Sequence, residues 1–234
     1  MGGLTVAMPV RNEASRYLRE VLTSVAAYAD RIVVLDDQST DDSPAVARSL
    51  GAEVYHTPES LFHDEWRLRT QLWELAGAGQ PEWILSLDAD EIFEPQVVRV
   101  MPFLLGHPEL NWFGFPLYDL WNDRQHYRDD PLWTAHHLIW PLLVRYRPGF
   151  PYHFRRRAHH CGRLPENALV DPGAASPLKL LHLGWLDPAD RQAKYDRYRR
   201  LDPEGKWGSL AQYESILDSA PQLSSLEGVS GWPG

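Results

Sequence analysis

Hydrophobic and polar positions follow two different periods in the N-terminal part of the chain. Short apolar runs, typical of buried strands, alternate with longer segments in which apolar residues recur every three or four positions, as on one face of a helix. The predicted strands span residues 4–8, 31–35, 53–56 and 83–87, and the predicted helices span residues 14–28, 44–50 and 62–78. Because short connections join strand to helix, we expect an α/β fold with a Rossmann-like, mostly parallel sheet flanked by helices.

The alternation weakens after residue 94. The pattern there predicts a helix over residues 95–105 and strands over residues 112–115 and 138–144. Pro116 and Pro141 accompany these strands, and proline in sheets is found mainly on edge strands or at bulges. We therefore expect edge or bent strands in a smaller mixed region.

A second clear signal comes near the C-terminus. Residues 178–183 form an apolar run that predicts a strand, and a helix should begin with Asp187 as its cap, Pro188 at its first position and Asp190 in its first turn. The segment 219–234 is rich in Ser, Gly and Pro, so we expect a flexible tail.

The composition is that of a globular protein. Of 234 residues, 44% are hydrophobic and 24% are charged, and the net charge of −9 argues against a nucleic-acid partner. The single cysteine, Cys161, excludes an internal disulfide framework. No apolar run is long enough to cross a bilayer and no secretion signal is present, so we expect a cytoplasmic protein without a transmembrane segment.

Two of the predicted strands end in paired acids. Asp36 and Asp37 follow the second strand, and Asp88 and Asp90 follow the strand over residues 83–87. The carboxyl ends of parallel strands share one edge of the sheet, where ligands bind in open α/β folds. Carboxylates at such an edge can hold Mg²⁺ or Mn²⁺ together with substrate phosphates, whereas a single solvated acidic turn would not predict two converging clusters.

Three segments resemble motifs of the family 2 glycosyltransferases of the GT-A fold. They are residues 8–13, 32–42 and 87–91, in the order and rough spacing of that family. The resemblance covers about the first hundred residues. It implies one GT-A domain over residues 1–218, with a nucleotide-binding half over residues 1–94 and an acceptor-binding half over residues 95–218.

The resemblance also assigns roles in binding the nucleotide. Pro9, Val10 and Asn12 would lie on the loop under the base. Asp36 and Asp37 would hold the uracil or the ribose of a nucleotide sugar. Gln38 stands where the family more often has glycine, a departure that bears on the choice of base.

Four further residues would bind the diphosphate or the metal by the same resemblance. Asp88 and Asp90 match the Asp-x-Asp motif that carries a divalent ion, Mn²⁺ or Mg²⁺, and the diphosphate. Arg69 matches an arginine that contacts the diphosphate, although a surface helix charge is the simpler alternative. His182, in a Leu-His-Leu-Gly-Trp segment, resembles a histidine that joins the metal; its alternative is a structural histidine.

The residues expected to bind the acceptor are marked by composition and not by a specific motif. Residues 118–133 are polar and aromatic, as expected of a segment that binds a sugar, a lipid-linked or a small-molecule acceptor; the alternative is an ordinary loop with core tryptophans. Residues 155–160 form a basic patch that could meet a phosphate of the donor or of a lipid-linked acceptor, with a solvated loop as the alternative. Peripheral contact with a membrane stays open. A general base should take the proton of the acceptor hydroxyl. Glu166 is the first candidate, with Asp130 and Asp119 as alternatives.

The sequence therefore predicts a metal-dependent glycosyltransferase that moves a sugar from a UDP- or GDP-type donor to an acceptor hydroxyl, with inversion as the resemblance implies. A sugar nucleotidylyltransferase would need a glycine-rich loop that residues 10–13 lack, and residues 88–92 depart from the motif of aspartyl phosphatases. A non-catalytic nucleotide- or glycan-binding homologue stays open as an alternative.

Overall fold

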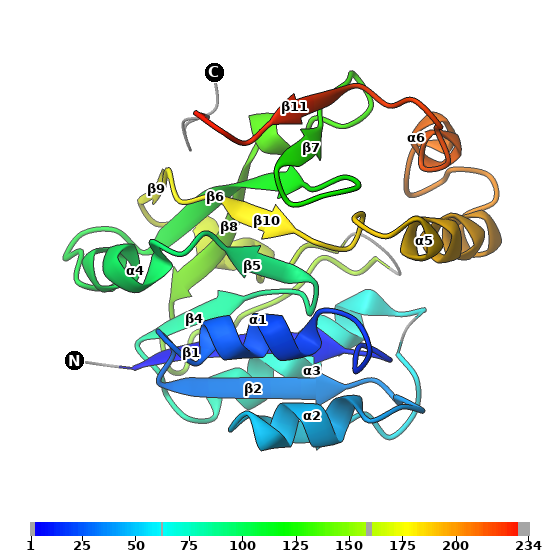
Figure 1. Cartoon of the computed structure of the whole chain (residues 1–234). Coiled ribbons are helices and arrows are strands. Elements are labelled where there is room, and N and C mark those ends of the chain that lie inside the picture. The colour runs from blue at the N-terminus through cyan, green and yellow to red at the C-terminus, as the bar shows by residue number, and fades with distance from the viewer. Residues whose placement is uncertain (1–2, 62, 158–160, 229–234) are drawn as a thin grey trace.

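A single large sheet runs through the molecule (Figure 1). The computed structural model describes residues 3–61, 63–157 and 161–228. Within them, nine strands pair in the order β3-β2-β1-β4-β8-β6-β10-β5, with β9 beside β6. These strands are β1 (Leu4–Val10), β2 (Arg31–Asp36), β3 (Glu53–His56), β4 (Trp83–Ser86), β5 (Glu91–Phe93), β6 (Trp112–Asp119), β8 (Ile139–Arg145), β9 (Gly173–Ala175) and β10 (Leu180–His182).

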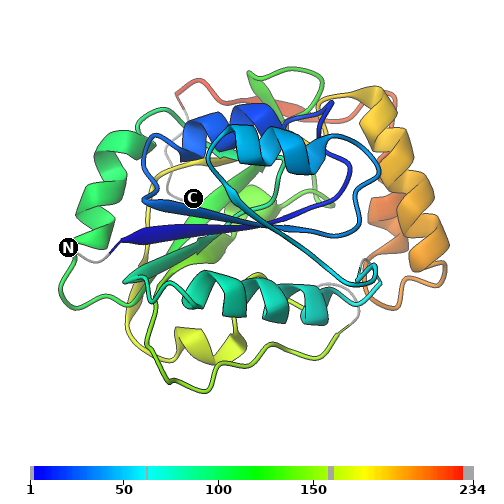
Figure 2. The same ribbon diagram turned by 90° about the horizontal axis from the view of Figure 1, so that it is seen from below.

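Helices cover both faces of the parallel part of the sheet. The helices of the described residues are α1 (Leu18–Val25), α2 (Ser43–Ser49), α3 (Glu65–Gly77), α4 (Val97–Leu105), α5 (Pro188–Leu201) and α6 (Leu210–Ser215), with short 3₁₀ helices η1 (Ala135–His137) and η2 (Glu166–Leu169). Figure 2 shows α1 and α2 on one side of the sheet and α3 on the other. The predicted α/β fold with a mostly parallel sheet is confirmed.

Alternation within the strands explains why both faces are apolar. Successive side chains of a strand point to opposite faces. Val34 of β2 packs in the core with α1, whereas its neighbours Val33 and Leu35 pack in a second core with Leu72 and Trp73 of α3. A continuous apolar run is therefore what a strand covered on both faces requires.

The predicted edge position of the two proline-containing strands is wrong. β8 lies between β4 and β6, and β6 lies between β8 and β10, so both strands are interior. The structure does show the expected irregularity, because the register shifts between Phe113 and Gly114, next to the Gly114–Pro141 pair. A bulge lets the ladder accommodate a residue that has no backbone N–H.

Part of the predicted flexible tail is built into the structure. β11 (Leu223–Ser225) pairs antiparallel with β7 (His126–Arg128), with Leu223 opposite Arg128. The prediction is therefore wrong for residues 223–225, because tail composition does not reveal a strand whose partner lies far away in sequence. Residues 229–234 lie outside the described residues.

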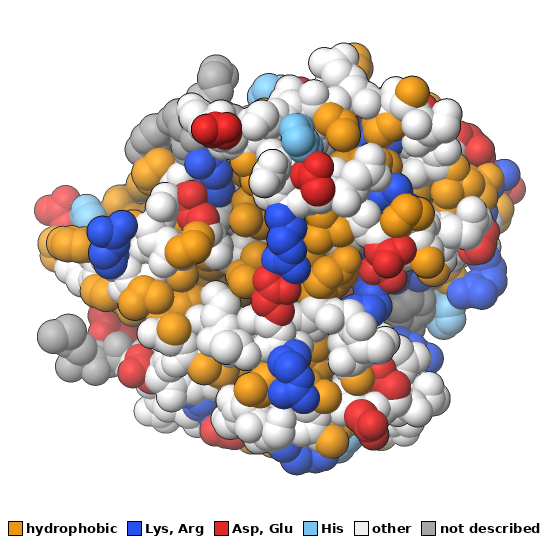
Figure 3. Space-filling model, viewed as in Figure 1, with side chains coloured by type: hydrophobic (Ala, Val, Ile, Leu, Met, Phe, Trp, Pro, Cys, Tyr) orange, Lys and Arg blue, Asp and Glu red, His pale blue; other side chains and the backbone are white. Residues whose placement is uncertain are grey.

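The remaining features of the fold are its surface charge, the length of its helices and the position of α5. The face seen in Figure 3 carries acidic and basic side chains interspersed among apolar ones. None of the helices in the described segments is both long and apolar enough to span a bilayer. Near the carboxyl ends of β1 and β2 stands α5 (Figures 1 and 2). Its residues Arg197 and Arg200 line a pocket together with the loop that follows β1.

Candidate active site

A cleft of about 770 Å³ opens at the carboxyl edge of the parallel strands. The structure brings most of the predicted site residues to its wall, although they come from distant segments. Those lining the cleft are Pro9, Val10, Asp37, Arg69, Asp88, Asp90, Glu166 and His182. Asp36, Asn12, Asp119 and Asp130 do not line it, and their positions are described below.

Two arginines bind Asp88. Arg69 of α3 donates to Asp88 Oδ1 at 2.8 Å, and the guanidinium of Arg163 lies 3.2 Å from Oδ2. Burial alone would raise the pKa of the Asp88 carboxyl, but the two arginines lower it. Arg69 is buried against this carboxylate, so the alternative of a surface helix charge is wrong.

Glu91 holds the side chain of Arg163 in place through a hydrogen bond. Its side chain is fully buried and accepts hydrogen bonds from the Asp88 backbone N–H at 3.0 Å and from Arg163 at 2.5 Å. Its other oxygen is buried without a hydrogen-bond partner, and burial raises the pKa of the carboxyl. Sequence reasoning missed Arg163, because nothing near residue 163 marks it as a neighbour of β4.

Asp90 faces a different pair of partners. Its Oδ2 lies 3.3 Å from His182 Nε2 and 3.1 Å from Lys194 Nζ, and the same Lys194 atom lies 3.3 Å from His182 Nε2. A Cβ atom on Gly184 would fall within 3 Å of all three atoms, so a larger residue at this position would push these side chains aside. Sequence reasoning missed Lys194, which reaches the site from the middle of α5.

Asp119 lies behind His182. Its Oδ1 is 2.7 Å from His182 Nδ1 and accepts a hydrogen bond from Trp185 Nε1 at 3.0 Å. Burial alone would lower the pKa of His182, but Asp90 and Asp119 raise it to about 9. Burial would likewise raise the pKa of Asp90, whereas Lys194 and His182 hold it well below its usual range.

The Asp90–His182 pair fits a divalent ion. A carboxylate oxygen and an imidazole nitrogen 3.3 Å apart have the separation of two neighbouring ligands of one ion, and Asp119 orients the imidazole as a partner of metal-bound histidine commonly does. The ammonium of Lys194 now lies beside both atoms, and Asp88 is turned to its arginines. For these residues to hold an ion, Lys194 would have to leave Asp90 and His182, and Asp88 would have to turn from its arginines.

The acids after β2 are both buried. Asp37 accepts from the Leu61 backbone N–H at 2.6 Å and from Thr57 Oγ1 at 3.0 Å, which anchors the loop that follows β3. Asp36 lies 3.1 Å from His56 Nδ1, and its other oxygen is buried without a hydrogen-bond partner. Of the two, only Asp37 reaches the cleft wall.

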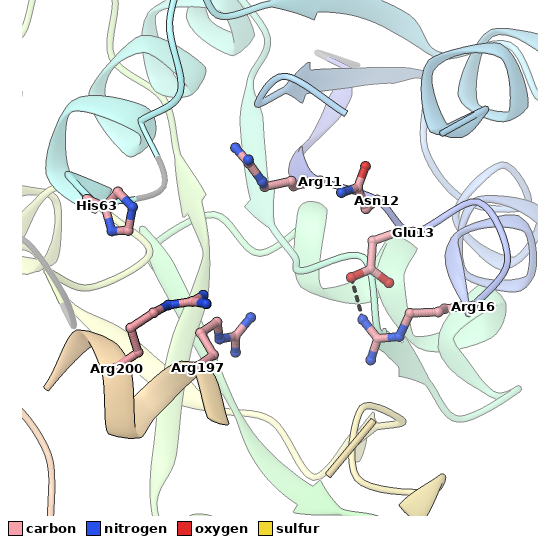
Figure 4. Close-up of a pocket in the computed structure, with 7 residues that line it drawn as sticks. All are labelled: Arg11, Asn12, Glu13, Arg16, His63, Arg197 and Arg200. Atoms are coloured by element: carbon pink, nitrogen blue, oxygen red, sulfur yellow. Dashed lines mark hydrogen bonds and ion pairs between the residues drawn. The ribbon is translucent and has the colours of Figure 1, made fainter. Parts of the chain in front are cut away.

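Asn12 belongs to a smaller, basic pocket of about 350 Å³ that adjoins the cleft (Figure 4). The pocket is lined by Arg11, Asn12, Glu13, Arg16, His63, Arg197 and Arg200. Asn12 has a positive φ of 55°, and its side chain accepts from the Thr40 N–H at 2.8 Å, which fixes the loop after β1 to the loop after β2.

One acid of this pocket is held next to an arginine. Glu13 pairs with Arg16 at 2.5 Å, as the dashed line in Figure 4 shows, and burial raises the pKa of Glu13 to about 7. Arg197 and Arg200 of α5 lie across the pocket from this pair (Figure 4), so the pocket presents several cations to any ligand.

The three candidates for the general base lie in different surroundings. Glu166 lines the cleft, is 42% exposed and pairs with Arg155 at 3.3 Å. Asp130 binds Arg128 at 2.7 Å and the Leu132 backbone N–H at 2.9 Å, away from the cleft wall. Asp119 faces His182. Glu166 is therefore the favoured candidate, because it is the one of the three that lines the cleft.

Of the predicted basic patch, His159 and His160 lie outside the described residues.

Comparison with known sequences gives a family match. A sequence model described as glycosyl transferase family 2 matches residues 5–158. An uncharacterized protein of Mycobacterium tuberculosis is 28% identical over 223 residues, which cover 91% of this chain and 54% of that protein. An uncharacterized glycosyltransferase of Rickettsia felis is 36% identical over 81 residues, covering 35% of this chain and 26% of that protein. The chain thus spans about half of the mycobacterial protein.

Solved structures with a similar fold include TarS of S. aureus. The crystal structure of its residues 1–349 has a TM-score of 0.55 and 17% sequence identity, and covers 92% of this chain and 69% of that chain. The same fragment in complex with UDP has a TM-score of 0.54 and 14% identity, with the same coverage. At this level of identity the likeness shows the fold.

Proposed function

The chain belongs to glycosyl transferase family 2, and on that basis we propose that it transfers a sugar from a nucleotide-diphosphate sugar of the UDP or GDP type to an acceptor hydroxyl. UDP is the first nucleotide to test, because the TarS fragment of similar fold was crystallised with it.

The observation that carries the proposal is the ring of cations around two carboxylates. Arg69, Arg163 and Lys194 lie within 3.2 Å of Asp88 or Asp90 at the end of β4. The adjoining pocket adds further arginines from the loop after β1 and from α5. A diphosphate carries the charge that such a pocket would bind, and a divalent ion would bridge it to the carboxylates.

Each residue then has a defined role. Asp88, Asp90 and His182 would hold Mn²⁺ or Mg²⁺. When bound, the ion stabilises the negative charge that develops on the leaving diphosphate. Arg69 and Arg163 bind and orient the same diphosphate oxygens, and Asp119 holds the imidazole of His182 in place.

Glu166 acts as the general base in this proposal. Its carboxylate accepts the proton of the acceptor hydroxyl while the hydroxyl oxygen bonds to the anomeric carbon and the bond from that carbon to the diphosphate breaks. Attack from the face opposite the leaving group inverts the anomeric configuration. Trp140 lies on the same cleft wall and offers an aromatic surface for a sugar acceptor.

Calorimetric titration with UDP and GDP, with and without Mn²⁺, tests the proposal. We expect binding that Mn²⁺ strengthens in the wild type and that Asp90→Asn uncouples from Mn²⁺; circular dichroism checks that the variant stays folded, since loss of the Asp90 ion pairs should lower its melting temperature. Nucleotide binding that Mn²⁺ strengthens equally in Asp90→Asn would contradict the metal assignment. Absence of binding by either nucleotide would contradict the donor class.

A further inference from the structure

A second cluster of potential metal ligands lies outside the cleft. Asp129 directly follows β7, and His136 and His137 belong to η1. One ligand atom from each of these side chains lies within 4.8 Å of the others, and no other set of His, Cys, Asp or Glu in the described segments meets this distance. We propose that Asp129, His136 and His137 form a binding site for a transition-metal ion, Zn²⁺ in the first place, which clamps the β7–η1 region to β11.

The first argument is a buried imidazole nitrogen that makes no hydrogen bond. His136 is 6% exposed, and its Nε2 is buried without a hydrogen bond. The atom lies 3.2 Å from Asp129 Oδ1, but not in the geometry of a hydrogen bond. Leaving a buried polar atom unsatisfied costs roughly 1–3 kcal/mol, and a metal ion between Nε2 and Oδ1 would satisfy both atoms.

The second argument is that the surroundings hold the ligands in place. The ring of His136 packs edge-on against Tyr127, with 4.8 Å between ring centroids, and is stacked on Tyr118 at 5.9 Å. Ser224 of β11 donates to Asp129 Oδ2 at 2.6 Å, which leaves Oδ1 facing the imidazole. Fixed outer partners of this kind are typical of metal-binding side chains.

The kind of ion follows from the ligand atoms. Two imidazoles and one carboxylate suit Zn²⁺ better than Mg²⁺ or Ca²⁺, which prefer oxygen ligands. Ligands of a tetrahedral Zn²⁺ ion are roughly 3.3 Å apart, so the 3.2 Å separation of Asp129 and His136 needs no movement. The exposed ring of His137, 4.0 Å from that of His136, would complete the set by rotating.

The position of the cluster indicates a structural role with a route to the cleft. The Asp129 backbone N–H donates to Gln222 O just before β11, so an ion on Asp129 would strengthen the attachment of that strand. On the other side, Trp140 Nε1 donates to Ala135 O in η1 at 3.0 Å, and Trp140 lines the cleft. An occupied cluster would therefore fix one wall of the cleft.

The test uses tag-free protein treated with EDTA and titrated with Zn²⁺. The background variant Asp90→Asn with His182→Ala removes the proposed catalytic ion site, so that binding there cannot be mistaken for binding at the cluster. We expect one Zn²⁺ per chain, and a melting temperature raised by about 5–10 °C when free Zn²⁺ is a hundredfold above its Kd. Co²⁺ in place of Zn²⁺ should give the visible absorption of a tetrahedral nitrogen- and oxygen-ligated ion.

His137→Ala is the decisive variant, because this exposed side chain can be removed with little effect on the ion-free fold. We expect it to weaken Zn²⁺ binding by tenfold or more and to abolish the Co²⁺ absorption, and Asp129→Asn should do the same. The matched control is His126→Ala, a half-buried histidine of β7 outside the cluster, which should bind Zn²⁺ like the parent. No Zn²⁺ binding by the parent, or equal binding by the parent and His137→Ala, overturns the proposal. None of these readouts depends on glycosyl transfer, so the outcome is separate from that of the proposed function.

Discussion

At the scale of single residues, two basic side chains compete for one carboxylate oxygen of the site. His182 and Lys194 share one oxygen of Asp90, and Asp119 supports the imidazole from the other side. Buried charges of this kind are tolerated because each has an oppositely charged partner within hydrogen-bond distance. For these side chains to hold a metal ion, His182 would have to be neutral and Lys194 would have to move away from Asp90.

The proton at His182 predicts how metal binding depends on pH. Because the neighbouring carboxylates raise the pKa of His182 to about 9, and metal binds only the neutral imidazole, affinity for Mn²⁺ should increase by up to about tenfold per pH unit from about pH 6.5 to about pH 9. Calorimetry over that range measures it. In His182→Ala the dependence should be much weaker, and an unchanged profile would show that another group sets it.

The raised pKa of His182 also predicts how the stability of the metal-free protein depends on pH. The raised pKa means that the folded state holds the proton more tightly than the unfolded state, whose histidine titrates near 6.5. The stabilisation is complete below about pH 6.5 and is lost as the pH rises through about 9. Thermal melts should therefore show a decline over this window that His182→Ala lacks.

The ammonium of Lys194 predicts a gain of metal affinity when it is removed. Lys194→Met keeps the length of the side chain but removes the charge that lies 3.1 Å from Asp90 Oδ2. We expect Mn²⁺ to bind about tenfold more tightly in the absence of nucleotide, since one repulsive charge is lost. Arg199→Met, on the same helix but paired with Glu214, is the control. Weaker Mn²⁺ binding by Lys194→Met would show that Lys194 helps to organise the ion site.

Removing the proposed base should lower turnover and spare donor binding. Glu166→Gln keeps the shape of a side chain on the cleft wall, and loss of a general base typically costs about 10²–10⁴ in rate. Turnover with a saturating donor is compared with nucleotide affinity on the same protein. Asp130→Asn, which alters a carboxylate away from the cleft wall, should keep turnover within a few-fold of the wild type. The opposite ranking of the two variants would move the role to Asp130.

At the scale of elements, α5 contributes most of the positive charge from the C-terminal part of the chain to the site. It carries Lys194 and Arg197 to the cleft, and Arg197 and Arg200 to the adjoining pocket. The predicted start of this helix is confirmed: Asp187 accepts from the Ala189 N–H at 2.7 Å. Asp187→Ala should therefore cost about 1 kcal/mol of stability, a drop of roughly 2–4 °C in melting temperature. Asp196→Ala, an exposed change in the same helix, should have a smaller effect; equal effects would mean that the cap contributes nothing.

At the scale of the whole molecule, the sequence predicted what is local and missed what depends on distant pairing. β1 to β4 and the acids after β2 and β4 follow from local patterns, and so does the start of α5. The interior position of β6 and β8 could not be predicted, because it depends on which strands pair. Arg163 and Lys194 were missed for the same reason, since only the fold brings them to Asp88 and Asp90. Asp119 was a candidate base because it lies in a polar segment, but the sheet places it against His182.

The arrangement of α5 has a consequence for its motion. Its buried residues are Arg191 and Lys194, whereas those of α1 are all aliphatic, so α5 is held to the body largely by charged groups over aromatic rings and by ion pairs such as Arg16–Asp190. Added salt weakens partly exposed ion pairs but not apolar packing. Amide exchange in α5 should therefore accelerate with ionic strength while exchange in α1 does not, so that the helix carrying Lys194 to the cleft should be the more easily opened of the two.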